Sequence, residues 1–227
     1  MKFPLSPSTV LRNTVLRIST PFIISALLLG NASAHAQYDT LFIDAAQGEE
    51  MTQLRLGMGE TPAGAEGERV TSMFYLSYFE SDDLVKVDGV SRGEQNVEIL
   101  ALGAGGFGYL ENPQENGGAE FDFELSQTRI DGLDNYKRTG IGFRTQLFIP
   151  MAAGLQTNIG FNIRPFFLSS DWDDQAQLEY EYQAGLEYAF SWDIALYAHY
   201  RYVAIIDNND DTVSLAEGSI IGVRARF

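Results

Sequence analysis

The chain has 227 residues and a strong excess of acid: 15 lysines and arginines stand against 31 aspartates and glutamates, for a formal net charge of −16. This balance argues against DNA or RNA as a partner, because phosphate binding needs a positive surface. The absence of cysteine excludes disulfides, thiolate metal sites and cysteine nucleophiles. A hydrophobic content of 45%, with 22 glycines, 11 tyrosines and 15 phenylalanines, is typical of a folded β-protein rather than of a disordered acidic chain.

The first 36 residues predict a secretory signal peptide. They combine a basic start that contains no acid, an apolar stretch over 18–29 and small residues at the end of the segment. The apolar stretch is too short for the roughly 20 residues that a membrane-spanning helix needs. We therefore expect a signal peptide over 1–36 and one folded domain over 37–227. The residues that mark the expected cleavage site are Ala34, Ala36 and Gln37.

Segments of alternating polarity follow along the rest of the chain. The ranges 51–58, 71–80 and 96–109 are expected to be strands, although their alternation is irregular, and 38–46 has the weakest pattern. Alternation becomes regular after residue 120, and it is cleanest over 178–190. One face of that segment carries the apolar and aromatic residues Leu178, Tyr180, Tyr182, Ala184, Leu186, Tyr188 and Phe190. The other face carries glutamates.

The length of these segments and their connections predict a transmembrane β-barrel. Soluble strands usually run about 5–6 residues, whereas the pattern over 178–190 is twice as long. Tight turns at 150–154 and 191–193 alternate with longer, acidic connections at 130–136, 169–176 and 207–216, as in outer-membrane barrels. We expect an all-β, antiparallel, up-and-down barrel of about ten strands, with eight as the second possibility. A secreted soluble β-sandwich or lipocalin-like barrel is the alternative.

The end of the chain supports the membrane barrel. Residues 220–227 finish on an aromatic, with an apolar face opposite two arginines. This pattern resembles the C-terminal signature by which bacterial outer-membrane proteins are recognised for insertion. The residues of this assembly signal are Ile221, Val223, Ala225 and Phe227. Aromatics also group near both predicted rims, as interfacial girdles would: Phe148, Phe190, Trp192 and Phe227 on one side, and Tyr136, Phe166, Phe167 and Trp172 on the other.

Two segments near the C-terminus are similar to the YfaZ family of small bacterial outer-membrane β-barrel proteins. They are Tyr200-Arg-Tyr-Val203, which precedes an Asp/Asn-rich loop, and Leu215-Ala-Glu-Gly-Ser-Ile-Ile-Gly-Val-Arg-Ala-Arg-Phe227. The glycine-rich range 100–109 resembles the early strands of that family. The resemblance implies a fold and a location in the outer membrane, and it implies no catalytic residues.

The polar faces of the strands predict a charged lumen. Acids on 178–190 are flanked by strands that carry basic residues, so that opposite charges can pair in a confined space. The expected ion-pair network comprises Arg144, Arg164, Glu179, Glu181, Glu187, His199, Arg201, Arg224 and Arg226. Other side chains expected to point inward are Arg55, Glu98, Glu120, Asp122 and Glu124. Those expected to face lipid are Phe143, Ile159, Phe161, Tyr180, Tyr182, Leu186 and Leu196.

Catalytic and metal sites are not expected. The run 207–211 resembles the opening of a calcium loop, but Thr212 and Gly218 stand where an EF-hand needs glycine and glutamate. The run 170–174 is equally weak. His199 with Ser191 or Ser219 lacks a hydrolase motif around it. No cofactor is predicted.

The functional expectation is a non-enzymatic barrel of the bacterial outer membrane, exported through the periplasm, with a structural or surface-interaction role and a lumen plugged by ion pairs. A narrow channel for small solutes or cations is the alternative, since freely conducting porins need about 16 strands. The expected partners are outer-membrane lipid and, through the C-terminal strand, the barrel-assembly machinery. The oligomeric state is left open.

Overall fold

A computed structural model describes residues 40–60, 68–82, 84–87, 90–94, 96–110, 117–131, 137–170, 176–191 and 194–227. The predicted signal peptide and its cleavage site lie outside these residues, as do Tyr136, Trp172 and Trp192. Within the described part, no helix is long and apolar enough to cross a membrane.

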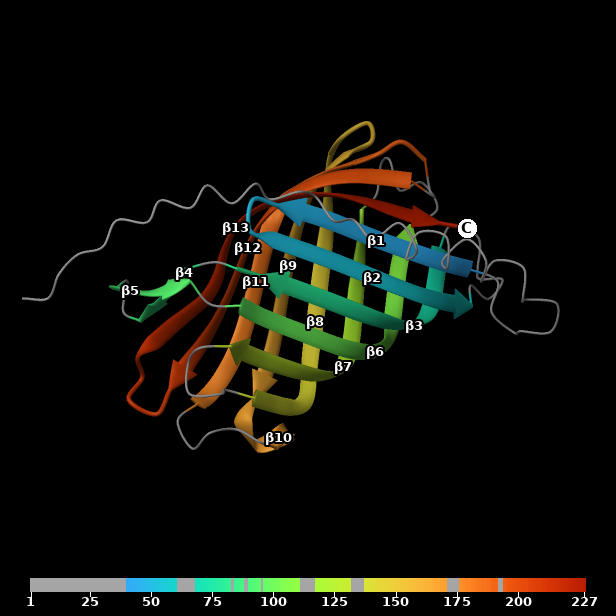
Figure 1. Cartoon of the computed structure of the whole chain (residues 1–227). Helices are drawn as coiled ribbons and strands as arrows, with labels where there is room; N and C mark the ends of the chain where they lie inside the picture. The colour runs from blue at the N-terminus through green and yellow to red at the C-terminus, as the bar shows by residue number, and fades with distance from the viewer. Residues whose placement is uncertain are drawn as a thin grey trace, which may run out of the picture. The chain divides into compact units, whose positions relative to one another are not determined.

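Ten antiparallel strands form one closed barrel (Figure 1). In chain order they are β1 (Thr40–Gly48), β2 (Met51–Glu60), β3 (Glu68–Ser81), β6 (Asn96–Leu110), β7 (Gly118–Asp131), β8 (Lys137–Ala152), β9 (Leu155–Pro165), β11 (Ala176–Ala189), β12 (Ile194–Asp207) and β13 (Thr212–Arg226). Each strand pairs with the next, and β1 pairs with β13 to close the sheet. The predicted class and the count of ten are confirmed.

Three small elements lie off the ring of ten strands. A hairpin of β4 (Leu84–Val87) and β5 (Val90–Glu94) lies between β3 and β6 in sequence, and β4 pairs with the first residues of β13. A short 3-10 helix, η1 (Phe166–Leu168), and β10 (Ser169–Ser170) follow β9, and β10 pairs with β8. We call the end of the barrel that carries Thr40 and Phe227 the C-terminal rim, and the other end the opposite rim.

One connection at the opposite rim is shorter than the sequence suggested. The predicted acidic loop over 207–216 contains only residues 208–211, because β13 begins at Thr212. Leu215 and Ala216 are buried inside the barrel, and this burial extends the strand into the predicted loop. The connection between β1 and β2 at the same rim is also tight, with Glu49 and Glu50 between the strands. Connection lengths therefore do not alternate cleanly from one rim to the other.

The outer face of the barrel is an apolar belt. Large hydrophobic side chains are exposed on the nine ring strands that follow β1, among them Phe74, Leu102, Phe123, Leu147 and Ile159. A soluble monomer rarely exposes a continuous apolar surface of this extent, and lipid is the solvent that such a belt fits. The predicted facing of the side chains is confirmed on β8, β9, β11 and β12. Exposed or half-exposed side chains of the expected lipid-facing set are Phe143, Ile159, Phe161, Tyr180, Tyr182, Leu186 and Leu196.

The interior contains two apolar clusters in addition to charges. Near the C-terminal rim, Phe42, Met73, Tyr75, Phe107 and Phe148 pack together. Toward the opposite rim a larger cluster includes Met51, Phe79, Val97, Ile99, Ile130, Val203, Ile205, Leu215 and Ile220. The charged residues occupy the space between the clusters and beside them. Irregular alternation in the N-terminal strands has its cause here, because apolar residues on those strands face inward as well as outward.

Two expected positions are corrected by these clusters. Glu98 was expected inside, but it is half-exposed between the buried residues Val97 and Ile99 of β6. Phe148 was expected in a girdle at the rim, but it is buried and makes an edge-on contact with Phe107, with ring centroids 5.9 Å apart. In both cases the interior takes the apolar side chain, because it fills space without needing a hydrogen-bond partner.

Candidate functional site

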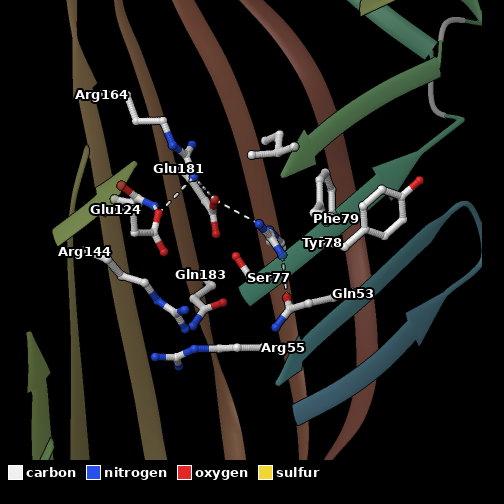
Figure 2. A pocket seen from close by; sticks show the side chains of 13 residues that line it. Gln53, Arg55, Ser77, Tyr78, Phe79, Glu124, Arg144, Arg164, Glu181 and Gln183 are labelled. Carbon is white, nitrogen blue, oxygen red and sulfur yellow. Dashed lines mark hydrogen bonds and ion pairs between the residues drawn. The ribbon is translucent and has the colours of Figure 1, made fainter. Parts of the chain in front are cut away.

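A chain of ion pairs links three neighbouring strands, β9, β11 and β12, inside the barrel. Arg164 on β9 contacts Glu179 at 2.9 Å and Glu181 at 3.5 Å, both on β11. Arg201 on β12 contacts Glu181 at 2.9 Å. Glu181 therefore lies between two guanidinium groups, as Figure 2 shows. All four side chains are buried, and the strand order places acids on β11 between bases on its two neighbours.

This chain reaches the strands on the far side of the barrel. Arg201 also donates through Nη1 to Oε1 of Gln53 on β2, and its guanidinium lies 3.9 Å from the centre of the Phe79 ring on β3. Arg164 contacts Glu124 on β7 at 3.5 Å. The interaction links strands that are not neighbours in the sheet, so it ties the walls of the barrel together across the lumen.

A second cluster surrounds Arg55 on β2. Its guanidinium contacts Glu120 at 2.6 Å and Asp122 at 3.1 Å, both on β7, and lies 3.8 Å from the centre of the Tyr75 ring. The Tyr75 hydroxyl lies 2.7 Å from Glu124 and 3.1 Å from Asp122. Arg144 approaches the same Glu120 oxygen at 4.0 Å. The predicted inward positions of these acids and of Arg55 agree with their burial.

A third cluster lies at the seam where the barrel closes. Asp44 on β1 and Arg224 on β13 are register partners, and Asp44 Oδ2 accepts from Arg224 Nε at 3.2 Å and from Nη2 at 3.1 Å. Tyr197 donates to the other oxygen of Asp44. Arg224 Nη1 contacts Glu187 at 3.2 Å, and Glu187 also accepts from Gln156 at 2.8 Å. Where β1 and β13 pair to close the sheet, their charged side chains therefore also join one hydrogen-bonded network.

His199 lies inside the barrel but differs from the expected ion-pair partner. Its ring stacks on Tyr197, with centroids 4.3 Å apart and an interplanar angle of 21°. No ion pair links it to any residue that the structure describes, and its Nε2 atom has no hydrogen-bond partner there. The reason is its cross-strand partner, Gly185. A Cβ atom at Gly185 would lie 2.6 Å from the His199 Cα, so the strand opposite His199 presents backbone and no carboxylate.

Arg226 also differs from its neighbours in the expected network. It is half-buried near the C-terminal rim, and its guanidinium lies 4.0 Å from the centre of the Phe107 ring. It therefore covers the apolar cluster at that rim. The residues of the predicted assembly signal occupy the outer face: Ile221, Val223 and Phe227 are exposed and Ala225 is half-exposed.

Several interior residues were missed or underweighted from sequence. Asp44 lies in the segment with the weakest pattern, although Phe42, Asp44 and Ala46 do alternate inward. Arg138 is fully buried beside Ser126, to which its Nη1 donates at 2.8 Å, although it lies at the start of β8. The sequence signal for Arg138 is its alternation with Gly140 and Gly142 on one face of the strand.

The geometry does not support the catalytic pair or the calcium loop that were considered from the sequence. Ser219 is exposed on the outer face whereas His199 is buried inside, so this pair lies on opposite faces of the sheet. Asp207 Oδ1 accepts the backbone N–H of Asn209 at 2.8 Å and of Asp211 at 2.9 Å. The N–H of Asp211, joined by that of Asn209, lowers the pKa of Asp207 below its ordinary value. Among the described residues no group of three or more His, Asp or Glu side chains could hold a metal ion.

Comparisons with known proteins find similarity only among solved structures. No family model and no curated protein matches the chain. The β domain of the Bordetella autotransporter BrkA is 14% identical, with a TM-score of 0.41 over 84% of this chain and 98% of that one. The KdgM porin is 10% identical, with a TM-score of 0.33 over 83% and 99%. The NanC porin is 12% identical, with a TM-score of 0.35 over 82% and 98%.

The sheet topology and the two faces of the strands define the class of protein. A closed ring of ten antiparallel strands with an apolar outer belt and a charged interior is a transmembrane β-barrel. Its particular role has to be inferred from the interior of this chain, because identities of 10–14% transfer no residue roles.

Proposed function

We propose that this barrel resides in the bacterial outer membrane, with its interior closed by side chains, and serves a structural or surface-interaction role without catalysis. The observation that carries the proposal is the filling of the lumen. Three clusters of ion pairs lie between and beside two apolar clusters, and their members are buried except for the half-buried Arg144. A ring of ten strands is too narrow to hold these side chains and an open aqueous pore as well.

Two further features support this reading. The C-terminal residues 221–227 present alternate apolar side chains outward, as a signal for the barrel-assembly machinery and outer-membrane lipid would require. The β4–β5 hairpin extends the sheet beyond the ring through β13 and offers a surface at the opposite rim. Membership of the YfaZ-like family is part of the proposal, and it depends on the C-terminal residues alone.

Planar-bilayer recording tests the closed interior. We expect the barrel to insert without reproducible conductance steps, and the shift in gel mobility between heated and unheated samples to show that inserted protein is folded. Regular steps from folded barrels would contradict the proposal and favour the second candidate, a narrow channel. The cavity beside Arg144, described next, is the observation that favours that candidate.

A further inference from the structure

A small cavity lies at mid-barrel, where the chains of ion pairs meet (Figure 2). Its volume, counted as the space open to the centre of a water molecule, is about 30 Å³. Since one water needs roughly 10–15 Å³ by this measure, the space holds about two small occupants. The ionised side chains of its wall are Arg55, Arg144, Arg164, Arg201, Glu124 and Glu181.

The two carboxylates of the wall are already engaged. Glu181 is held by Arg201 and Arg164. Glu124 accepts from Tyr75 at 2.7 Å and from Asn162 at 2.7 Å, and it contacts Arg164 at 3.5 Å. Glu124 is contacted at both of its oxygens, whereas both contacts of Glu181 are made to Oε2.

The guanidinium groups, by contrast, include N–H donors that have no acceptor among the described residues. The Nε–H groups of Arg55, Arg164 and Arg201 are buried and have no hydrogen-bond partner among the described residues. Arg144 donates through Nη2 to Gln146 at 3.1 Å, and its ion contact with Glu120 is at the long distance of 4.0 Å. Because the same Glu120 oxygen is held at 2.6 Å by Arg55, Arg144 is the cation with the weakest partner.

An occupant that satisfies these donors must accept hydrogen bonds. Unpaired buried donors cost free energy, and guanidinium groups interact most strongly with an anion. One acceptor in the wall, Asn162 Oδ1, has no partner, and a water molecule beside the anion would satisfy it. We propose that the cavity binds one small inorganic anion of the size of chloride, held chiefly by Arg144. This inference concerns binding and does not require the barrel to be silent or conducting.

Bromide in place of chloride provides a direct probe. Crystals of the full-length folded barrel grown with bromide should show an anomalous peak in the cavity within hydrogen-bond distance of Arg144. The peak should disappear in Arg144→Gln and persist in Arg129→Gln, a matched change at an exposed arginine on the outer face. Absence of a peak in the wild-type cavity, or an unchanged peak in Arg144→Gln, would overturn the proposal.

A solution measurement covers the case in which a variant crystallises poorly. At equal ionic strength, chloride should stabilise the folded wild type relative to gluconate, which is too large for the cavity. With chloride at ten times its Kd, the unfolding equilibrium constant should fall by about a factor of ten. Arg129→Gln should keep this dependence. Equal stability of the wild type in both salts would reject the anion site. The proposal of a closed interior is tested separately, by planar-bilayer recording.

Discussion

Asp44 and Arg224 face each other across the seam of the barrel, on strands that lie at opposite ends of the folded domain. Their side chains make two hydrogen bonds to one carboxylate oxygen, at 3.1 and 3.2 Å, and both residues are buried. The strands β1 and β13 could close the ring through backbone hydrogen bonds in several registers. A buried pair of opposite charges is satisfied in only one of them, so it favours the native register.

Removal of Asp44 should therefore weaken the closed barrel. Asp44→Ala removes the oxygen that accepts two hydrogen bonds from Arg224 and the oxygen that accepts from Tyr197, and truncation of one partner of a buried pair costs about 3–5 kcal/mol. Urea titrations of the folded barrel in detergent or liposomes measure the free energy of unfolding. Asp131→Ala, at an exposed position on β7, should change it by no more than about 0.5 kcal/mol. Equal effects of the two changes would show that the seam pair contributes nothing.

Arg201→Ala should destabilise the barrel by a similar amount, about 3–5 kcal/mol, because Glu181 and Gln53 both lose a buried donor. Arg129→Ala is the matched control on the outer face and should have little effect on the urea midpoint. A wet lumen predicts a different result: an altered ion selectivity in bilayers for Arg201→Ala, with a midpoint close to that of the wild type. That outcome would favour the narrow channel.

Leu215 tests the apolar cluster toward the opposite rim. It is fully buried inside the barrel, so Leu215→Ala should cost about 2–5 kcal/mol through lost burial and the cavity that remains. Leu215→Met conserves the volume and should cost less than about 1.5 kcal/mol. Unfolding midpoints of the two variants should be compared under identical conditions. Indifference to both changes would mean that this part of the interior is not packed.

Two phenylalanines test the position of the membrane. Phe123 is half-exposed within β7 and touches Phe121 and Phe143, whereas Phe167 is exposed on η1 at the opposite rim. An arginine on the lipid face costs about 2–4 kcal/mol at the midplane and about 0–1 near the interface. Phe123→Arg should therefore impair folding into liposomes far more than Phe167→Arg. The reverse order would mean that the membrane midplane lies closer to Phe167 than to Phe123.

The turn after β12 should respond to acid. Because Asp207 accepts two backbone N–H groups, its pKa is lowered in the folded state. The stabilisation that it provides is complete above the unfolded-state value of about 3.9 and is lost as the pH falls through the lower, folded-state value. NMR titration should show the Asp207 carboxyl changing below pH 3.9, together with the amides of Asn209 and Asp211. Asp207→Asn should abolish that common transition, and a normal pKa for Asp207 would refute the turn geometry.

Alternation along the chain was sufficient to predict the architecture and the facing of the C-terminal strands. Period-two alternation over 178–190 allows one register, since a shift by one residue would turn Glu179, Glu181 and Glu187 toward lipid. The same reasoning worked for Ile159, Phe161 and Arg164. On β6 it failed, because Val97, Ile99 and the outward Leu100 are all apolar, and no alternation then distinguishes the inside from the outside.

Which charges meet, and which side chains fill the remaining space, depends on the closed ring of strands. Alternation shows that Arg224 faces inward, but its partner Asp44 comes from the other end of the domain and is known only once β1 and β13 have paired. His199 was placed inside correctly, yet its environment depends on Gly185 across the strand. The cavity beside Arg144 arises where side chains from eight strands converge. Such contacts depend on the closure of the whole ring, which local patterns along the chain do not encode.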